Sequence, residues 1–443
     1  MCFLRVNGKL KCQVLRSNHF QLVTVSMKLT GYLFAALRTG TYRTSQKRVC
    51  SFVASPATFR LTHRPGRVPT DNNLLTRTMS SDAANKNTNY NEEIQILIDQ
   101  MKQPFPLIDV DCNLLHQDLT SMLAESSDDI YQATSSANLR ILHHPSTVAS
   151  NIHGVFSPSS TIDEAENFHS ILLESTRESR NDIDVRMGVG VHPYHAEEAG
   201  ELTEELESST RNRIDTLFAK DKLEGKGFLT CIGEMGLDYS EGFPHKDKQL
   251  PWFEFQLRLA KQYSLPIFIH ERLAFEDTIS LIDEVFADTS SCPPIIIHCF
   301  TGSKEECKKY IERGYFLSVS GYILKNGDGP DEVKDCLRSG IIPMDKLMIE
   351  TDAPYMGFNS CRDTYYEFEA ETNAEFQAFN SKKRKRLIKG IYPNVPSSLP
   401  KVLDSAVELL NEGRRDRNEE ELSTKDVARM FFENAANFFG IQS

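Results

Sequence analysis

Polar residues of the types that bind divalent metals stand where several apolar, strand-like runs of this sequence end. The run PIFIHER reaches His270, and 28 residues later the run PIIIHCF reaches His298. Glu234 follows the run LTCIG, and Asp352 follows LMIET. If the fold brings them together, two imidazoles and two carboxylates form a donor set for a hard or borderline divalent ion such as Mg²⁺, Mn²⁺ or Zn²⁺.

The spacing of these four residues matches the repeat of a βα unit. They are separated by 36, 28 and 54 residues, which is close to one, one and two units of the ~31 residues that each unit of an eightfold barrel occupies. Side chains at the carboxyl ends of barrel strands face one mouth, where barrel enzymes carry out their chemistry. We therefore expect Glu234, His270, His298 and Asp352 to converge on a site for one or two metal ions.

Eight strand-like runs recur from about residue 105 onward and would supply the scaffold. Most are β-branched or aromatic and nearly continuous in apolar character, which is typical of strands buried on both faces. Amphipathic segments such as 197–218, 250–264 and 303–314 lie between them. This alternation predicts an α/β protein with a (β/α)₈ TIM barrel, and a doubly wound open sheet is the alternative. The expected strands are 107–114, 152–159, 185–193, 229–236, 266–272, 294–300, 315–321 and 347–354.

The chain divides into an N-terminal leader and one domain that is long enough for an α/β barrel. We expect the barrel domain to occupy 105–443, with insertions at about 115–151 and 358–397, and to end in two helices near 400–412 and 424–440. Residues 1–100 are expected to form a basic, acid-poor extension that is disordered or carries a targeting signal.

Charge separates the two parts sharply. Residues 1–70 contain 12 Lys and Arg and no Asp or Glu, which gives them a charge of +12. Because the net charge of the whole chain is −12, the remaining residues carry −24. The Arg-rich leader suits a mitochondrial transit peptide, whereas Met79 opens an alternative start that would leave the protein in the cytoplasm or nucleus. An acidic body does not bind polyanions through its net charge, so a phosphate substrate would require local cations or metal.

Cysteine and apolar content indicate an intracellular protein. The ten cysteines show no CxxC motif, and several lie inside strand-like runs, which favours reduced, mostly buried thiols. No apolar run approaches the ~20 residues that a membrane span requires. We predict neither a membrane partner nor an obligate protein partner.

Five ordered blocks of sequence carry a more specific signal. HERLA has Ala274 where a zincin HExxH motif needs its second histidine, and neither a GxSxG elbow nor a GxxxxGK loop is present. The blocks GVGVHPYH, CIGEMGLDYS, PIFIHER, IIIHCFTGSKEE and IETDAPYM instead resemble, in order, the TatD family of metal-dependent deoxyribonucleases. The resemblance covers roughly 105–443 apart from the insertions.

The resemblance implies a TIM-barrel metallohydrolase of the amidohydrolase-like kind. Family members are Mg²⁺-dependent nucleases that typically remove nucleotides from the 3′ end of DNA, and some act on RNA. Carried over by position, Glu234, His270, His298 and Asp352 would bind metal, and His192 and Arg272 would contact the substrate phosphate. We further hypothesise that Glu234 lies between two metal positions and that Asp352 accepts the proton of the attacking water.

Three departures from the family pattern bear on the site. Many members begin with D-x-H-x-H, whereas LIDVDCNL places Asp109, Asp111 and Asn113 there; one branch of the family has Gly and Asn instead of the two histidines. Asp111 would either bind a second metal or only order the end of the strand. Leu273 and Val395 replace two carboxylates that are usual in the family.

The insertion after the last strand contains the basic run 382–386. It would guide a nucleic-acid backbone toward the metal, act as a nuclear localisation signal, or form a solvated face. Two functions other than a nuclease also remain open. A barrel metallohydrolase could cleave another ester or amide such as aminoacyl-tRNA, and a chain with a decayed site could bind nucleic acid without cleaving it.

Overall fold

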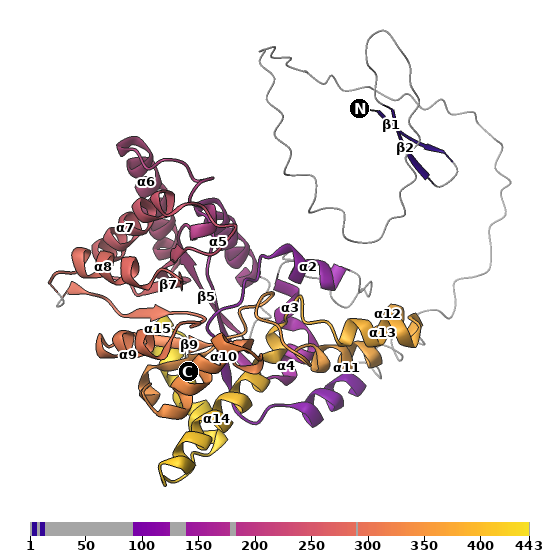
Figure 1. The fold of residues 1–443 in the computed structure, drawn as a ribbon. Helices are drawn as coiled ribbons and strands as arrows, with labels where there is room; N and C mark the ends of the chain where they lie inside the picture. Colours follow the sequence, from indigo (N-terminus) through magenta and orange to yellow (C-terminus); the bar gives the residue numbers. More distant parts are fainter. Residues whose placement is uncertain are drawn as a thin grey trace, which may run out of the picture. The chain divides into compact units, whose positions relative to one another are not determined.

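The computed structural model describes residues 2–6, 9–13, 92–124, 139–177, 183–288 and 291–442 (Figure 1). Two short antiparallel strands, β1 (Cys2–Val6) and β2 (Lys9–Gln13), belong to the leader. The expectations of disorder or a targeting signal in the leader, and the alternative start at Met79, otherwise lie outside the described residues.

Eight parallel strands pair in sequential order from β3 to β10. The first and last strands meet at their carboxyl ends, where Asn113 N donates to Ala353 O at 2.8 Å and Asp352 N donates to Asp111 O at 2.9 Å. This closure confirms the TIM barrel and excludes the open sheet. The strands are β3 (Leu107–Asp109), β4 (Ile152–Ser157), β5 (Asp184–Val189), β6 (Leu229–Asp238), β7 (Ile267–Arg272), β8 (Ile295–Ile297), β9 (Phe316–Val319) and β10 (Leu347–Ile349).

Helices follow the strands and cover the outside of the barrel (Figure 1). The helix expected over 303–314 has the local signals that define it, because Ser303 and Glu306 form a reciprocal capping box. The helix expected from 197 begins later, at Glu204, where the Thr203 side chain caps its first turn. The outer helices are α5 (Ile162–Arg177), α6 (Glu204–Glu224), α7 (Lys246–Tyr263), α8 (Phe275–Val285), α9 (Lys304–Glu312), α10 (Asp328–Ser339) and α14 (Leu399–Asp416).

The described parts of the two insertions form a helical lobe on one side of the barrel (Figure 1). A further helix over 92–101 joins it, because Ile98 packs against Ala149 and Phe368. We refer to these helices together as the insertion lobe. They are the helix over 92–101, α2 (Gln117–Ala124), α3 (Arg140–His143), α4 (Pro145–Ala149), α11 (Asp363–Thr372), α12 (Ala374–Ala378) and α13 (Ser381–Ile388).

The barrel interior is a separate apolar cluster closed by the last helix, α15 (Thr424–Phe439). Phe156 of β4 and Phe268 of β7 lie 4.8 Å apart between ring centroids, and Phe439 of α15 stacks on Phe156 at 4.3 Å. Burial of each aromatic ring removes a large apolar area from water. The terminal helix therefore closes one end of the barrel and leaves the other end for polar side chains.

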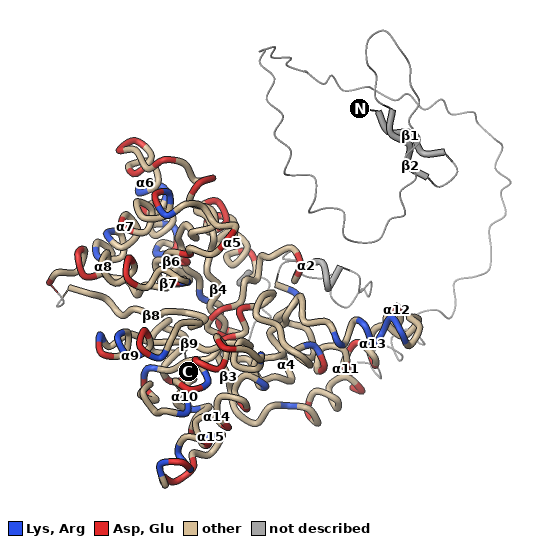
Figure 2. The backbone as a smooth tube through the Cα atoms, viewed as in Figure 1, with Lys and Arg blue, Asp and Glu red and all other residues tan. Residues whose placement is uncertain are grey.

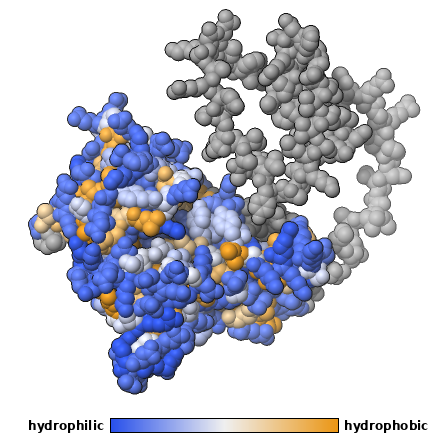
Figure 3. All heavy atoms as spheres, in the orientation of Figure 1, coloured by the Kyte–Doolittle hydropathy of each residue, from blue (hydrophilic) through white to orange (hydrophobic). Residues whose placement is uncertain are grey.

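The surface of the described residues is largely hydrophilic, with apolar side chains in small separate patches on the face that Figure 3 shows. Among the described ranges, no helix combines the length and apolar character that a membrane crossing requires. The seven cysteines described between residues 92 and 442 are free thiols, and six of them are buried, as expected from the sequence.

Candidate metal centre

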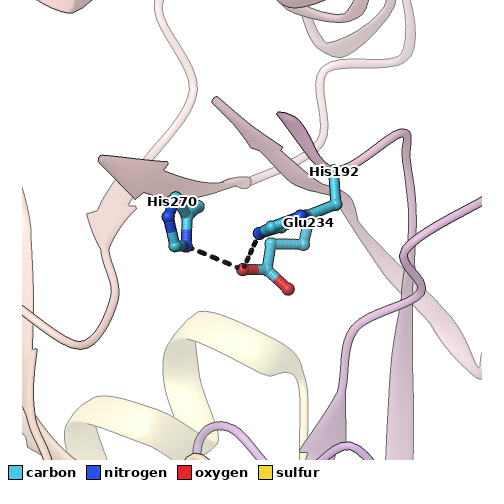
Figure 4. A group of neighbouring side chains, drawn as sticks. All are labelled: His192, Glu234 and His270. Atoms are coloured by element: carbon cyan, nitrogen blue, oxygen red, sulfur yellow. Dashed lines mark ion pairs between the residues drawn. The ribbon is translucent and has the colours of Figure 1, made fainter. Parts of the chain in front are cut away.

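One carboxylate oxygen lies at the centre of the polar cluster in the barrel mouth. Glu234 Oε1 lies 2.9 Å from His298 Nε2, 3.2 Å from His270 Nδ1 and 3.3 Å from His192 Nε2. Figure 4 shows two of these imidazoles, those of His192 and His270, pointing at the Glu234 carboxylate from neighbouring strands. The structure thus brings together Glu234 of β6, His270 of β7 and His298, which directly follows β8, and adds His192, which follows β5.

A β-bulge turns Glu234 into the mouth. Between Ile232 and Met235, β6 advances three residues while β7 advances two, so one extra residue is accommodated on β6. Cys231 faces the barrel interior, and the bulge lets Glu234 face the same side three residues later. The GEMG sequence allows this because Gly233 has φ +143° and a Cβ at that position would lie 2.4 Å from the Phe268 carbonyl oxygen.

A second group of donors surrounds the other face of His298. Its Nδ1 lies 2.9 Å from Asp111 Oδ2 and 3.6 Å from Glu350 Oε1, and all three residues are buried. The Asn113 amide links this group to Asp352, since its Nδ2 lies 3.5 Å from Asp111 Oδ1 and 3.4 Å from Asp352 Oδ1. The replaced first-strand positions therefore still face the site.

The residues present fit a divalent metal. Donor atoms of His192, Glu234 and His270 lie within 4.8 Å of one another, as do those of Asp111, Glu234 and His298. Asp111 Oδ2 and His298 Nδ1 have no hydrogen bond with good geometry among the described residues. Buried polar atoms without hydrogen bonds are costly unless another group satisfies them, and a cation between the donors would do so. Both donor groups include Glu234, and the hypothesis that it lies between two metal positions stays a prediction.

Burial and neighbouring charges oppose each other at this site. Burial alone would raise the pKa of Glu234, but the imidazoles of His192 and His298 hold it well below its usual range. For His298 burial acts in the opposite direction, and the charge of Glu234 nevertheless keeps its pKa well above the ordinary value. Burial raises the pKa of Asp352 to about 7, and the charge of Glu350 adds to this effect. The cluster thus holds an excess of carboxylates that a cation would stabilise.

Asp352 and Arg272 lie at the edge of this cluster. Asp352 follows β10 with a left-handed backbone (φ +50°) and is 8% exposed. It is outside both compact donor groups and is connected to them through Asn113. The Arg272 side chain is exposed at the end of β7, two residues after His270 and on the same side of the strand. It is therefore available to a molecule that enters the mouth.

Three carboxylates at the site were quoted in the sequence motifs without a role. Asp238 Oδ2 lies 2.9 Å from His270 Nε2, so it orients the imidazole. Glu350 accepts a hydrogen bond from Ser318 and faces His298. Asp109 accepts from both Thr351 N, at 2.8 Å, and Thr351 Oγ1, at 2.6 Å, which holds β10 against β3. A spacing of two from Asp352 would have indicated Glu350, since alternate strand residues share a face.

Comparison with known proteins identifies relatives that are described as exonucleases. The 3′-5′ ssDNA/RNA exonucleases TatD of Escherichia fergusonii and Cronobacter sakazakii are 33% and 35% identical over 167 residues, or 38% of this chain. The matched part spans 57% and 56% of those relatives, little more than half their length.

Solved structures share the fold. A TatD family hydrolase from Entamoeba histolytica has a TM-score of 0.54 at 20% identity and covers 76% of this chain and 99% of its own. A TatD homologue from Escherichia coli has a TM-score of 0.51 at 18% identity and covers 76% and 98%. The family model described as TatD related DNase matches residues 108–440, which includes β4 to β10 and all but the first residue of β3. The chain therefore belongs to the TatD family of DNase-related proteins.

Proposed function

We propose that this protein is a divalent-metal-dependent nuclease that hydrolyses phosphodiester bonds of DNA from the 3′ end and accepts RNA as a further substrate. The observation that carries the proposal is the Glu234 carboxylate, which three imidazoles approach within 3.3 Å, at the mouth of a barrel of this family. The curated relatives are described as 3′-5′ exonucleases of single-stranded DNA and RNA.

The ligands would be His270, His298, Glu234 and Asp352, with Asp111 as a further carboxylate. We favour Mg²⁺ over Mn²⁺ and Zn²⁺ because the site is rich in hard carboxylate oxygens. His192 lies in a donor group with Glu234 and His270, so it could bind metal as well as contact the phosphate. When bound, a divalent ion polarises a phosphoryl oxygen and lowers the pKa of a water molecule.

The remaining chemistry belongs to the side chains. Asp352 would contact the metal and also accept the proton of the attacking water, because its carboxylate stands at the edge of the two donor groups. Arg272 would hold the phosphate through two parallel N–H donors. Asp238 fixes the His270 ring through a 2.9 Å contact, so that its other nitrogen faces Glu234. Phe268 stacks beneath His298 with ring centroids 4.7 Å apart and keeps water from that side.

The test uses the full chain stripped of metal and single-stranded DNA labelled separately at its 5′ and 3′ ends. We expect a ladder that shortens from the 3′ end only after Mg²⁺ or Mn²⁺ is added, and no ladder with His298→Ala. Asp352→Asn should remain folded with activity lower by about 10³-fold. If neither DNA nor RNA is cleaved although metal binds stoichiometrically, the nuclease proposal is wrong. Near-normal turnover of Asp352→Asn would remove only that residue from the mechanism.

A further inference from the structure

The insertion lobe carries a cluster of cations that do not form ion pairs with acids. Helix α13 and its C-cap contain six Lys and Arg within eight positions, and Figure 2 shows them as a blue run on the lobe. Among the described residues, none of the six forms an ion pair, whereas Arg414, Arg415 and Arg417 of α14 and its C-cap all pair with glutamates. The six residues are Lys382, Lys383, Arg384, Lys385, Arg386 and Lys389.

This arrangement is unfavourable for the helix itself. Lys382 and Lys383 lie in the first turn, which contains no acid, although the helix dipole favours negative charge there. Lys382 and Arg386 also form a like-charge pair at a spacing of four, which destabilises a helix. None of the six side chains contributes to a buried core, because α13 has no buried residue. Lys383 lies over the Phe379 ring, with Nζ 3.1 Å from its centroid, but no ion pair or cation–π contact is found for the other five among the described residues. Their concentration on one helix therefore indicates an anionic ligand.

A pocket of about 500 Å³ lies beside this helix. Its walls combine aromatic rings of α11 and α12 with Arg386, Leu387 and Tyr392. Of the three acidic side chains in the wall, two have partners, since Asp118 accepts from the Tyr392 hydroxyl at 2.6 Å and Glu369 accepts from Asn373 at 2.7 Å; the third is Glu375. Aromatic walls beside a cationic rim suit a planar base whose phosphates stay outside.

Two exposed tyrosines connect the pocket with the metal centre. Tyr355 follows Asp352 by three residues and is 46% exposed, and Tyr392 is 47% exposed. Their ring centroids lie 6.3 Å apart. The Tyr355 hydroxyl lies 3.0 Å from His116 Nε2, and that of Tyr392 donates to Asp118, so both rings are held in place. Fixed, exposed aromatic faces lose little entropy when a base stacks on them.

We propose that the insertion lobe is a binding track for the single-stranded nucleic acid that extends from the metal centre. Bases stack on Tyr355 and Tyr392 and enter the aromatic pocket, while phosphates contact the cations of α13. The inference rests on the proposed nuclease function, and it assigns the strand that flanks the cleaved bond to a defined surface. It also explains how an acidic body holds a polyanion, because the cations are concentrated along one path.

The first experiment measures equilibrium binding of single-stranded DNA to the full chain in EDTA, so that no cleavage occurs. The variant Lys382→Gln/Lys385→Gln/Arg386→Gln is compared with Lys220→Gln/Lys222→Gln/Lys226→Gln, which removes three exposed charges near the end of α6 and the start of β6, opposite the mouth. A plot of log affinity against log salt has a negative slope, which should become less steep by about 2 for the α13 variant. This follows from the loss of three phosphate contacts at ~0.7 each. It should stay unchanged for the α6 variant. Equal slopes for the two variants would overturn the track.

The second experiment separates base stacking from general attraction of anions. Tyr392→Ala should weaken DNA binding by about tenfold, and Tyr392→Phe should retain the affinity, because the ring rather than the hydroxyl contacts the base. A poly-glutamate peptide serves as a polyanion without bases, and Tyr392→Ala should not change its binding. If the peptide and DNA lose affinity equally, the surface binds an acidic partner and the track is wrong. Both experiments omit catalysis, so a failure of the nuclease assay leaves their outcome interpretable.

Discussion

We expect Gly236, which has no side chain to contact a metal, to be essential for the spacing of the strands at the candidate metal centre. Gly236 lies between Glu234 and Asp238 on β6 and pairs with His270 on β7. Its φ is +144°, and a Cβ at this position would lie 1.8 Å from the His270 carbonyl oxygen. Because that oxygen belongs to the backbone, it cannot move aside alone. Gly236→Ala must therefore part the two strands that carry the ligands.

The structure sets the size of the effect. A Cβ contact shorter than 3.0 Å is essentially never observed, so β6 and β7 must separate by at least about 1.2 Å at this point. The left-handed backbone costs about 1–3 kcal/mol for alanine, and loss of two strand-pairing hydrogen bonds adds about 1 kcal/mol each. We expect the free energy of unfolding to fall by about 3–5 kcal/mol. The His270 Nδ1 to Glu234 Oε1 contact of 3.2 Å would be lost, with a metal affinity lower by about 10–100-fold.

Gly242→Ala is the matched control, because Gly242 also has a positive φ (+96°) but nothing lies within 4 Å of its Cβ position. It should show only the backbone cost and normal metal affinity. Denaturant titration measures stability, and calorimetric titration of the metal-free protein measures affinity. If the two variants behave alike in both assays, the close contact between Gly236 of β6 and His270 of β7 does not position the donor residues.

Three further predictions follow from the same geometry. Asp111→Asn should lower metal affinity at least about tenfold without unfolding the chain, whereas Asp345→Asn, an exposed change, should leave it unaltered; equal affinities would show that Asp111 only orders its strand. Phe268→Ala should cost about 3–5 kcal/mol of stability by denaturant titration, because the ring is fully buried, and a cost below about 1 kcal/mol would contradict the packing. Saturating metal at ~100 times Kd should stabilise the metal-free protein by about 2.7 kcal/mol in thermal unfolding, and no shift would mean that the site does not hold the ion.

The sequence predicted the strands and the three residues at the centre of the donor cluster for clear reasons. Strands buried on both faces are continuous apolar runs, so their carboxyl ends are visible where a polar residue interrupts them. Glu234, His270 and His298 are interruptions of this kind, and the structure joins them at one oxygen. The expected strands were too long for β3, β8 and β10, because the residues after Asp109, Ile297 and Ile349 leave the ladder to form the mouth.

The bulge and the supporting carboxylates could not be predicted in the same way. A period of two from Cys231 would have put Glu234 on the outer face of β6, and only the pairing register shows the extra residue. Asp238 and Glu350 are common acidic residues until the fold places each within 3.6 Å of an imidazole. Their roles depend on contacts between distant segments, which spacing along one chain does not encode.

The same dependence extends from the mouth to the end of the chain. Phe439 of the last helix stacks on Phe156, Phe156 packs on Phe268, and Phe268 stacks on the ring of His298. Closely packed interiors transmit displacement because they leave little free volume. We therefore expect a change at Phe439, 141 positions after His298 in sequence, to tilt an imidazole that lies 2.9 Å from both Asp111 and Glu234. Packing contacts thus connect the apolar end of the barrel with the donor residues at its mouth. Conservative changes of apolar residues far from the donor residues should therefore alter metal affinity.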